Sequence, residues 1–152
     1  MIVKDIMKKD AATCAPDGDL ASVINVMRGH DCGFLPVVDS HGIVVGVLTD
    51  RDICLTASTK HRSLARVSVR ETMSHPAFSC FPDENVKVVL ETMAKHHVRR
   101  LPVLNKTGHL EGVLSIDDIV QAPQRRGAPT ADDIVGALKR MYSPRPIETV
   151  TA

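Results

Sequence analysis

The sequence predicts a mixed α/β (α+β) protein, in which two β-α-β-β-α repeats pack as a pseudo-twofold pair and a C-terminal helix follows. The first observation behind this prediction is an internal repeat, because residues 3–53 and 69–119 align without a gap at an offset of 66. The second is that both copies carry the same order of helical and extended hydrophobic patterns. A period this long that occurs twice argues against a solenoid or propeller, in which several shorter units stack. We therefore expect two half-domains that share one core, and two equivalent sites.

Each copy is predicted to begin with a short amphipathic segment, an extended stretch that ends at a proline, and a helix. The segments are residues 3–7 and 69–73, and the acids after the prolines, Asp17 and Asp83, are expected to start the helix. The helices follow from hydrophobic residues at the i, i+3, i+4 and i+7 spacing. These stripes are Leu20, Val23, Ile24 and Met27 in the first copy and Val86, Val89, Leu90 and Met93 in the second. We expect the stripes to face the core and to remain partly available for dimer contacts.

A β-hairpin is predicted after each of these helices. In the first copy two apolar runs, residues 34–38 and 43–48, flank the turn-forming sequence Asp-Ser-His-Gly. The second copy repeats the pattern with residues 101–104 and 109–114 around Asn-Lys-Thr-Gly. In both copies the second strand runs directly into another helix, which completes the β-α-β-β-α order.

The remaining segments are predicted to be connectors and a terminal helix. Residues 55–68 are polar and basic, and residues 121–129 contain two prolines and a glycine. Thr130, followed by two aspartates, is an N-cap signal for an amphipathic helix to about Met141, and the last ten residues are expected to form a loose tail. The expected boundaries are residues 1–60 for the first domain, 61–122 for the second, and 123–152 for the linker, helix and tail.

Composition narrows the function classes. The chain has 152 residues with 19 basic and 18 acidic side chains, so its net charge of +1 offers no global attraction for nucleic acid or an anionic membrane. Aromatic residues make up only 3% of the sequence, which leaves few stacking partners beside the basic connector. No apolar run approaches the roughly 20 residues that a membrane span needs. We therefore expect a cytoplasmic protein without membrane or nucleic-acid partners.

The sequence offers no pattern typical of a metal centre or an active site. The four cysteines lack C-x-x-C spacing, so reduced and buried thiols are expected. His96 and His97 are adjacent and lack a third ligand at useful spacing. A Walker-type glycine loop and a nucleophile with a base and an orienting group are also missing, so we do not expect an enzyme.

The strongest functional signal is a seven-residue pattern, G-h-h-[S/T]-x-x-D, at the junction of each hairpin and its last helix. It occurs at residues 46–52 (GVLTDRD) and 112–118 (GVLSIDD). A strand that ends in a helix presents free backbone N–H groups and the positive end of the helix dipole, which suits a phosphate. The hydroxyl can donate to a phosphate oxygen, and the acid one turn on can accept from two ribose hydroxyls. The candidate ligand residues are therefore Thr49, Asp52, Ser115 and Asp118.

The alternative interpretation of this pattern is a capping box, which stabilises a helix start without any ligand. The duplication favours a ligand site, because the glycine, the hydroxyl and the final acid recur while the intervening residues differ. Both functions are compatible in one residue. Gly46 and Gly112 would allow a ligand or a backbone segment to come close.

The segment order, the Leu-Pro-Val strand in both copies, and the sequences GVLTDRDI and GVLSIDDI together resemble a tandem pair of CBS domains, named for cystathionine beta-synthase. The resemblance covers residues 3 to about 120. It implies two units packed sheet to sheet, with two clefts that bind adenosine-containing ligands such as AMP, ADP, ATP or S-adenosylmethionine. It also implies contacts with phosphate and ribose for the hydroxyl and acid of the seven-residue pattern. The extended stretch before the first helix of each unit would line the adenine pocket, which implies Thr13, Cys14, Ala15, Ser79, Cys80 and Phe81.

The two copies differ just before the Leu-Pro-Val strand. The second copy has Arg99-Arg100 where the first has Gly33-Phe34. Basic residues at these positions often reach ligand phosphates in the family, and a guanidinium suits bidentate phosphate contact. We therefore expect unequal clefts, one of which holds a phosphorylated nucleotide. The alternative is a solvated pair of arginines on an edge strand.

The leading functional hypothesis is a stand-alone, energy-sensing regulatory module that binds an adenine nucleotide or another adenosyl ligand. It would signal through a change of conformation or of dimer contacts, to an unknown regulated partner. Members of the family generally pair through their helices, so a homodimer is expected. The first alternative is a ligand-free scaffold for protein interactions, and the second is nucleic-acid binding through the basic connector.

Overall fold

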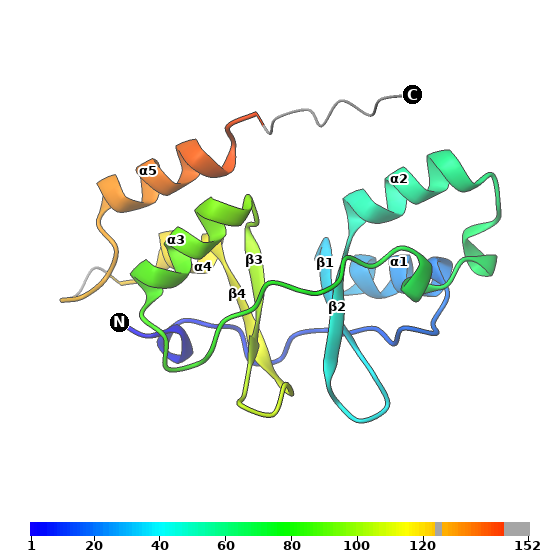
Figure 1. Ribbon diagram of the computed structural model, residues 1–152, viewed down its shortest axis with the longest axis horizontal. Coiled ribbons are helices and arrows are strands. Elements are labelled where there is room, and N and C mark those ends of the chain that lie inside the picture. The colour runs from blue at the N-terminus through cyan, green and yellow to red at the C-terminus, as the bar shows by residue number, and fades with distance from the viewer. Residues whose placement is uncertain (124–125, 145–152) are drawn as a thin grey trace.

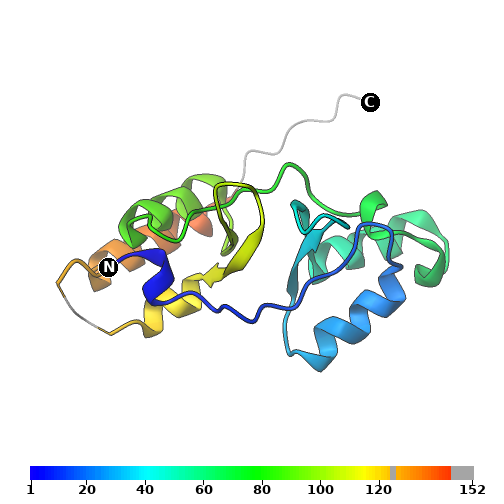
Figure 2. The same ribbon diagram turned by 90° about the horizontal axis from the view of Figure 1, so that it is seen from below.

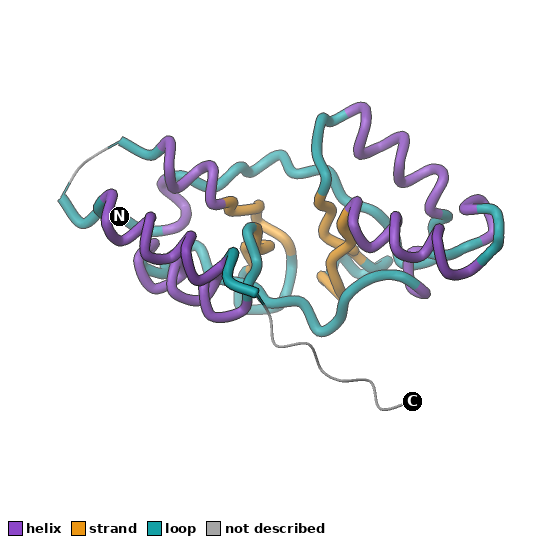
Figure 3. Tube along the Cα trace, turned by 90° about the horizontal axis from the view of Figure 1, so that it is seen from above, coloured by secondary structure: helices purple, strands orange, loops and turns teal. Residues whose placement is uncertain are grey.

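The protein consists of two similar halves that lie side by side, each a two-stranded hairpin with helices on its outer side (Figure 1). The computed structural model describes residues 1–123 and 126–144. Seen from above, the strands meet in the middle of the molecule and the helices lie toward its two ends (Figure 3). The first half contains α1 (Leu20–Gly29), β1 (Phe34–Val38), β2 (Val44–Thr49) and α2 (Asp50–Lys60). The second half contains α3 (Val86–His96), β3 (Arg100–Leu104), β4 (Leu110–Ser115), α4 (Ile116–Gln121) and α5 (Ala131–Met141).

The two predicted hairpins are confirmed, and they have the same register. Phe34 pairs with Thr49 in the first hairpin, and Arg100 pairs with Ser115 in the second. Their turns contain a glycine with a positive φ, Gly42 in one and its counterpart in the other, which the turn geometry requires. The hairpins also contact each other near these turns through an isolated antiparallel bridge between residues 43 and 109.

The first β element of each predicted β-α-β-β-α unit consists of a single parallel bridge. Cys14 forms one parallel bridge with Val37, and Cys80 forms the equivalent bridge with Val103. Cys14 donates its N–H to the Pro36 carbonyl and accepts from the Val38 N–H. The ladder ends there because the proline two residues further on has no N–H to donate.

The predicted helix starts are also corrected. The N-cap of α1 is Asp19, whose Oδ1 accepts from the Ser22 N–H at 2.9 Å, and the N-cap of α3 is Asn85. Asp17 and Asp83 lie two residues earlier, on the turn that follows each proline. Each acid pairs with the opening segment of the other repeat: Asp83 with Lys4 at 2.7 Å and Asp17 with Arg70 at 3.0 Å. The Lys4 ammonium holds the pKa of the Asp83 carboxyl below its usual value.

The opening segments of the two repeats are exchanged between the halves. Val3 packs in the core of the second half and donates its N–H to the Glu84 carbonyl at 3.0 Å. Its counterpart Val69 packs in the core of the first half and donates to the Gly18 carbonyl at 2.8 Å. Both valine side chains are completely buried. Consequently the chain crosses between the halves twice, once on each side of the molecule (Figure 2).

The expected single shared core is replaced by two separate clusters of buried side chains, one in each half. The cluster of the first half contains residues 20–53 of its own repeat together with Val67 and Val69. The cluster of the second half contains Val3, residues 80–119 of its own repeat and three residues of α5. The halves are therefore joined by exchanged segments and not by one continuous core.

The predicted C-terminal helix is confirmed as α5, which lies along α3. Its residues Ile134, Ala137 and Met141 are buried against the second half. Ion pairs join the two helices at both ends: Lys87 Nζ lies 2.9 Å from Asp133 Oδ2, and Arg140 Nη2 lies 2.6 Å from Glu91 Oε1. The two ion pairs thereby hold the first and last turns of α5 against α3.

The hydrophobic stripes of α1 and α3 are less available for dimer contacts than expected. All four stripe residues of α3 are buried, and Leu90 is only 1% exposed beneath α5. In α1 only Ile24, the counterpart of Leu90, remains accessible, with 38% of its surface exposed. The two halves therefore present different outer faces. Among the described residues, we find no helix with the length and apolar character to cross a membrane.

We predict that Val3→Ala and Val69→Ala each lower the free energy of unfolding by about 2 kcal/mol, because each removes a buried valine from the opposite half. Urea denaturation of the purified variants measures this loss. Val135→Ala, at a site 49% exposed on α5, is the control and should change stability by less than about 0.5 kcal/mol. A large loss in only one of the two valine variants would contradict the equivalence of the exchanged segments.

We predict that Asp133→Asn lowers the melting temperature at pH 7 and that this difference shrinks in acid. The Thr130 N–H, followed by the Lys87 ammonium, lowers the pKa of Asp133 to about 2. Because the folded pKa lies below the ordinary value of 3.8, the contribution is complete above that value and is lost as the pH falls toward 2. Thermal melts between pH 7 and pH 3 measure the difference. Asp132→Asn is the control, and a difference independent of pH would contradict the prediction.

Candidate functional site

The hydroxyl and the acid of each seven-residue pattern form a capping box. Thr49 is the N-cap of α2: its hydroxyl oxygen accepts from the Asp52 N–H at 3.1 Å, and Asp52 Oδ2 accepts from the Thr49 N–H at 2.9 Å. Ser115 and Asp118 make the same pair of bonds at the start of α4, at 3.2 and 2.8 Å. The capping interpretation is therefore correct as a description of local structure. The box uses only one carboxylate oxygen of each acid, so a further partner can bind the other.

One cleft of about 800 Å³ contains predicted ligand residues from both halves. Thr49 and Asp52 come from the first half, at the N-terminus of α2, and Arg99 and Arg100 come from the second half, at the start of β3. The cleft is also lined by the segment that crosses between the halves, by the end of α3 and by the residues that follow α5. The predicted hydroxyl, carboxylate and two guanidinium groups therefore share one hollow, which Asp50 and Arg51 also line, although Asp52 and Arg99 are 47 positions apart in the sequence.

The crossing segment passes along the edge of the hairpin and forms one wall of the cleft. Ser74 exchanges two backbone hydrogen bonds with Val47 of β2, at 2.9 and 3.0 Å. A Cβ atom on Gly46 would lie only 2.9 Å from the Ser74 carbonyl oxygen. Gly112 has the same relation to the other crossing segment, since its Cβ would lie 2.5 Å from the Lys8 carbonyl oxygen. The glycine of each pattern thus leaves room for the backbone of the crossing segment, and not for a ligand.

The second set of pattern residues lies in a different environment. Asp118 forms an ion pair with Lys8, with 3.7 Å between Nζ and Oδ1. Ser115 is 6% exposed, and neither it nor Asp118 lines the cleft that contains Arg99. Lys8 and Ser74 are equivalent positions of the two repeats. A cation therefore lies beside Asp118, whereas the cleft with Asp52 has a hydroxyl at that position. The two sets of pattern residues are therefore inequivalent in charge.

The stretch expected to line an adenine pocket lies elsewhere in both repeats. Cys80 is buried in the second core and Cys14 packs against the first, and burial raises the pKa of their thiols to about 12 and about 11. Phe81 is 48% exposed, and its N–H donates to Glu84. The other members of the expected set, none of which lines the cleft, are Thr13, Ala15 and Ser79. The residues that line it instead are Ser74, Pro76, Ala77 and Phe78.

Sequence reasoning missed an aromatic pair in the cleft. The rings of Phe78 and His96 stack with their centroids 3.9 Å apart, and both residues line the cleft. Phe78 is one of three phenylalanines in the chain and lies next to the stretch that was expected to hold adenine. The scarcity of aromatic residues was the signal that could have identified it. Such a pair offers a flat apolar surface for a heterocyclic ring.

Sequence reasoning also missed the contribution of the C-terminal segment. Met141, Tyr142 and Ser143 line the cleft, although the helix before them was expected only to dock on the rest of the protein. The Met141 carbonyl lies 3.1 Å from Nδ1 of His97. Tyr142 accepts a hydrogen bond from Arg99 at 3.3 Å. The wall formed by the end of α5 therefore touches one of the predicted phosphate-binding residues.

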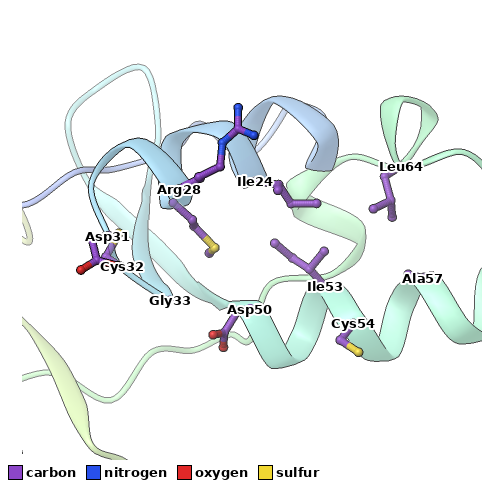
Figure 4. A pocket seen from close by; sticks show the side chains of 11 residues that line it. Ile24, Arg28, Asp31, Cys32, Gly33, Asp50, Ile53, Cys54, Ala57 and Leu64 are labelled. Carbon is purple, nitrogen blue, oxygen red and sulfur yellow. The ribbon is translucent and has the colours of Figure 1, made fainter.

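A second hollow of about 580 Å³ lies between α1 and α2 in the first half (Figure 4). Its walls are mainly apolar, with Ile24 from α1 and Ile53 and Ala57 from α2, and with Asp31 and Asp50 at one end. None of the predicted ligand residues lines it. Arg28 is the one basic residue in its lining.

Within residues 1–123 and 126–144, no group of three or more His, Cys, Asp or Glu side chains is arranged to hold a metal ion.

Comparison with known proteins identifies the architecture. A family model described as "CBS domain" matches residues 3–57 and 69–125. The CBS domain-containing protein YhcV of Bacillus subtilis is 33% identical over 117 residues, which are 77% of this chain and 81% of YhcV. The structure of the CBS domain pair of protein MJ0100, in complex with 5′-methylthioadenosine and S-adenosyl-L-methionine, superposes with a TM-score of 0.73 at 26% identity, over 80% of this chain and 94% of that one. The structure of CBSX2 in complex with AMP matches with a TM-score of 0.71 at 21% identity, over 79% and 93% of the two chains, which shows a common fold.

We predict that Thr49→Ala and Ser115→Ala each lower the free energy of unfolding by about 1 kcal/mol in the absence of any ligand, because each removes the acceptor for an N-terminal N–H of a helix. Thr49→Ser and Ser115→Thr retain that acceptor and serve as matched controls. Urea denaturation in nucleotide-free buffer measures the effect. Equal stability of the alanine variants and the controls would show that the hydroxyls do not act as caps.

Proposed function

The chain belongs to the CBS domain family, and from this we propose that it is a regulatory module that binds an adenosine-containing ligand in the cleft between its two halves. The observation that carries the proposal is that Thr49 and Asp52 line the same cleft as Arg99 and Arg100. Each pair comes from a different repeat. Ligand in this cleft would therefore contact both halves at once.

The groups in the cleft match the parts of a nucleotide. Asp52 has a carboxylate oxygen outside the capping box that can accept from ribose hydroxyls, as described above. The two guanidinium groups supply donors and positive charge for a phosphate. Phe78 and His96 supply a flat surface for a base. The ligands of MJ0100 and CBSX2, which are adenosyl compounds and AMP, support this class of ligand for the present chain.

We propose that this cleft prefers phosphorylated ligands, AMP, ADP or ATP, over S-adenosylmethionine. Two guanidinium groups attract a phosphate, whereas a sulfonium brings a positive charge toward them. Energy sensing follows as the proposed role, because the ligand would then be one of the adenine nucleotides. The second set, Ser115 and Asp118, lies beside Lys8 and lacks counterparts of the two arginines, so we propose weaker binding there.

The proposed output is a change in the contacts that this module makes, and we propose no enzymatic activity for it. A ligand has such an effect only if it binds one state better than the other. We propose a homodimer that uses the outer face of the first half, where Ile24 is accessible beside the hollow between α1 and α2. The corresponding face of the second half is covered by α5. A separate regulated protein would read the state of the dimer.

A ligand-free interaction scaffold is the second candidate function. The observation in its favour is that both capping boxes are complete without a ligand. In a scaffold, Asp52 and Asp118 would act only on helix stability, and the cleft would stay empty. The basic connector offers little support for nucleic-acid binding, because Lys60 and Arg62 both pair with Glu71.

We predict saturable calorimetric binding of AMP, ADP or ATP to the purified protein, with S-adenosylmethionine and NADH as comparison ligands. Asp52→Asn and Arg99→Ala should each weaken the preferred nucleotide about tenfold or more, because each removes a charge-assisted contact with the ligand. Asp118→Asn is the matched control, since it changes the same position of the other repeat and should leave the tight site intact. Flat traces with all five ligands would favour the scaffold instead.

A further inference from the structure

We propose that Tyr142 is a positioning residue for the nucleotide cleft, which holds the Arg99 guanidinium toward the ligand phosphate and so makes the cleft selective for phosphorylated ligands. The inference rests on the proposed function. It concerns a segment that begins beyond the two stretches matched by the family model, residues 3–57 and 69–125. The role of this tyrosine therefore belongs to this chain and does not follow from the family architecture.

The contact between Tyr142 and Arg99 combines a hydrogen bond with a cation–π interaction. Nη1 of Arg99 donates to the tyrosine hydroxyl at 3.3 Å, and Cζ of Arg99 lies 5.9 Å from the centroid of the tyrosine ring. Both interactions act on the same guanidinium. They use one edge and one face of this planar group, so its remaining N–H donors can bind a phosphate.

The position of Tyr142 is determined by the docking of α5. Buried Met141 immediately precedes Tyr142, and the ion pair of Arg140 with Glu91 ties the last turn of α5 to α3. The Met141 carbonyl also lies within hydrogen-bonding distance of His97, which caps α3 just before Arg99. The tyrosine and the arginine are thus supported by the same pair of helices. This arrangement fixes the tyrosine close to the arginine before any ligand arrives.

Such positioning matters because an arginine side chain on the surface samples many rotamers. Arg99 lies at the exposed entrance of β3, and it must lose that freedom to clamp a phosphate. A partner that restricts it in advance reduces this cost at the moment of binding. The benefit applies to a ligand with a phosphate. Adenosine carries none, so it gains nothing from an ordered Arg99.

The composition of the chain provides a direct optical probe of this contact. The sequence contains one tyrosine and no tryptophan, so the fluorescence of the protein comes from Tyr142. A phosphate that binds Arg99 changes the environment of the phenol ring. AMP should therefore change the tyrosine emission at concentrations that match its calorimetric binding curve.

The test compares AMP with adenosine in calorimetric titrations of the full chain and its variants. Tyr142→Ala should weaken AMP about fivefold, as expected for the loss of a partly exposed cation–π contact and its hydrogen bond, and Tyr142→Phe should weaken it less. Adenosine affinity should stay the same in both variants. In an Arg99→Ala background, Tyr142→Ala should cause no further loss of AMP affinity, because its effect passes through the arginine. Val135→Ala, on the exposed part of α5, is the matched control and should bind both ligands as the parent does.

Other outcomes would overturn the proposal in distinguishable ways. Equal AMP affinity in the parent and Tyr142→Ala proteins, or tighter binding by the variant, would show that the tyrosine is idle or competes with the phosphate. Parallel losses for AMP and adenosine would indicate that the variant merely disturbs the cleft. These results leave the proposed function intact. Failure of the parent protein to bind any adenine nucleotide would instead overturn the proposed function, and this inference with it.

Discussion

The exchange of opening segments between the two halves joins the molecule and positions its other elements. Val3 and Val69 are fully buried in the core of the repeat to which they do not belong. Equivalent ion pairs hold both exchanged segments in place: Lys4 pairs with Asp83, and Arg70, at the equivalent position of the other repeat, pairs with Asp17. Because neither half completes its core alone, the two halves fold as a pair. The exchange thus sets the relative position of all elements that line the cleft.

The same exchange creates the cleft and explains the glycine of each seven-residue pattern. Each crossing segment pairs with the strand that leads into the last helix of a repeat, and the close approach of the two backbones leaves no room for a Cβ. The crossing segment then becomes a wall of the hollow that contains Thr49 and Asp52. The glycine, which in the sequence could indicate a ligand site, therefore allows two backbone segments to pack closely in the folded protein. The hydroxyl and the acid serve capping in a similar way: each hydroxyl donates to one carboxylate oxygen of its acid, and the other oxygen of that acid lies outside the capping box.

Divergence at a few positions breaks the pseudo-twofold symmetry. Ser74 in the first crossing corresponds to Lys8 in the second, and the two arginines at the start of β3 correspond to Gly33 and Phe34. The C-terminal helix adds a further asymmetry, because it covers α3 and extends the wall of one cleft only. Backbone architecture is thus duplicated while the charge of the two sites differs. Under the proposed function, the two sites would therefore differ in their affinity for a ligand.

Local patterns in the sequence were sufficient for the repeat, the hairpins, the helices and the helix start at each hydroxyl, because hydrophobic periodicity and capping act over a few residues. They placed the N-caps of α1 and α3 two residues too early. An acid after a proline is typical of a helix start, but here it lies on the turn before the helix. The resemblance to CBS domains implied an adenine pocket at residues 13–15 and 79–81, and none of these residues lines the cleft, whose lining includes residues 74 and 76–78. Only the folded chain could show that Arg99 lines the same cleft as Asp52 and contacts Tyr142, because these residues belong to different repeats and to the segment after a terminal helix. The distances between these residues depend on which half each exchanged segment packs against. That choice is made by long-range packing, which a short stretch of sequence does not encode.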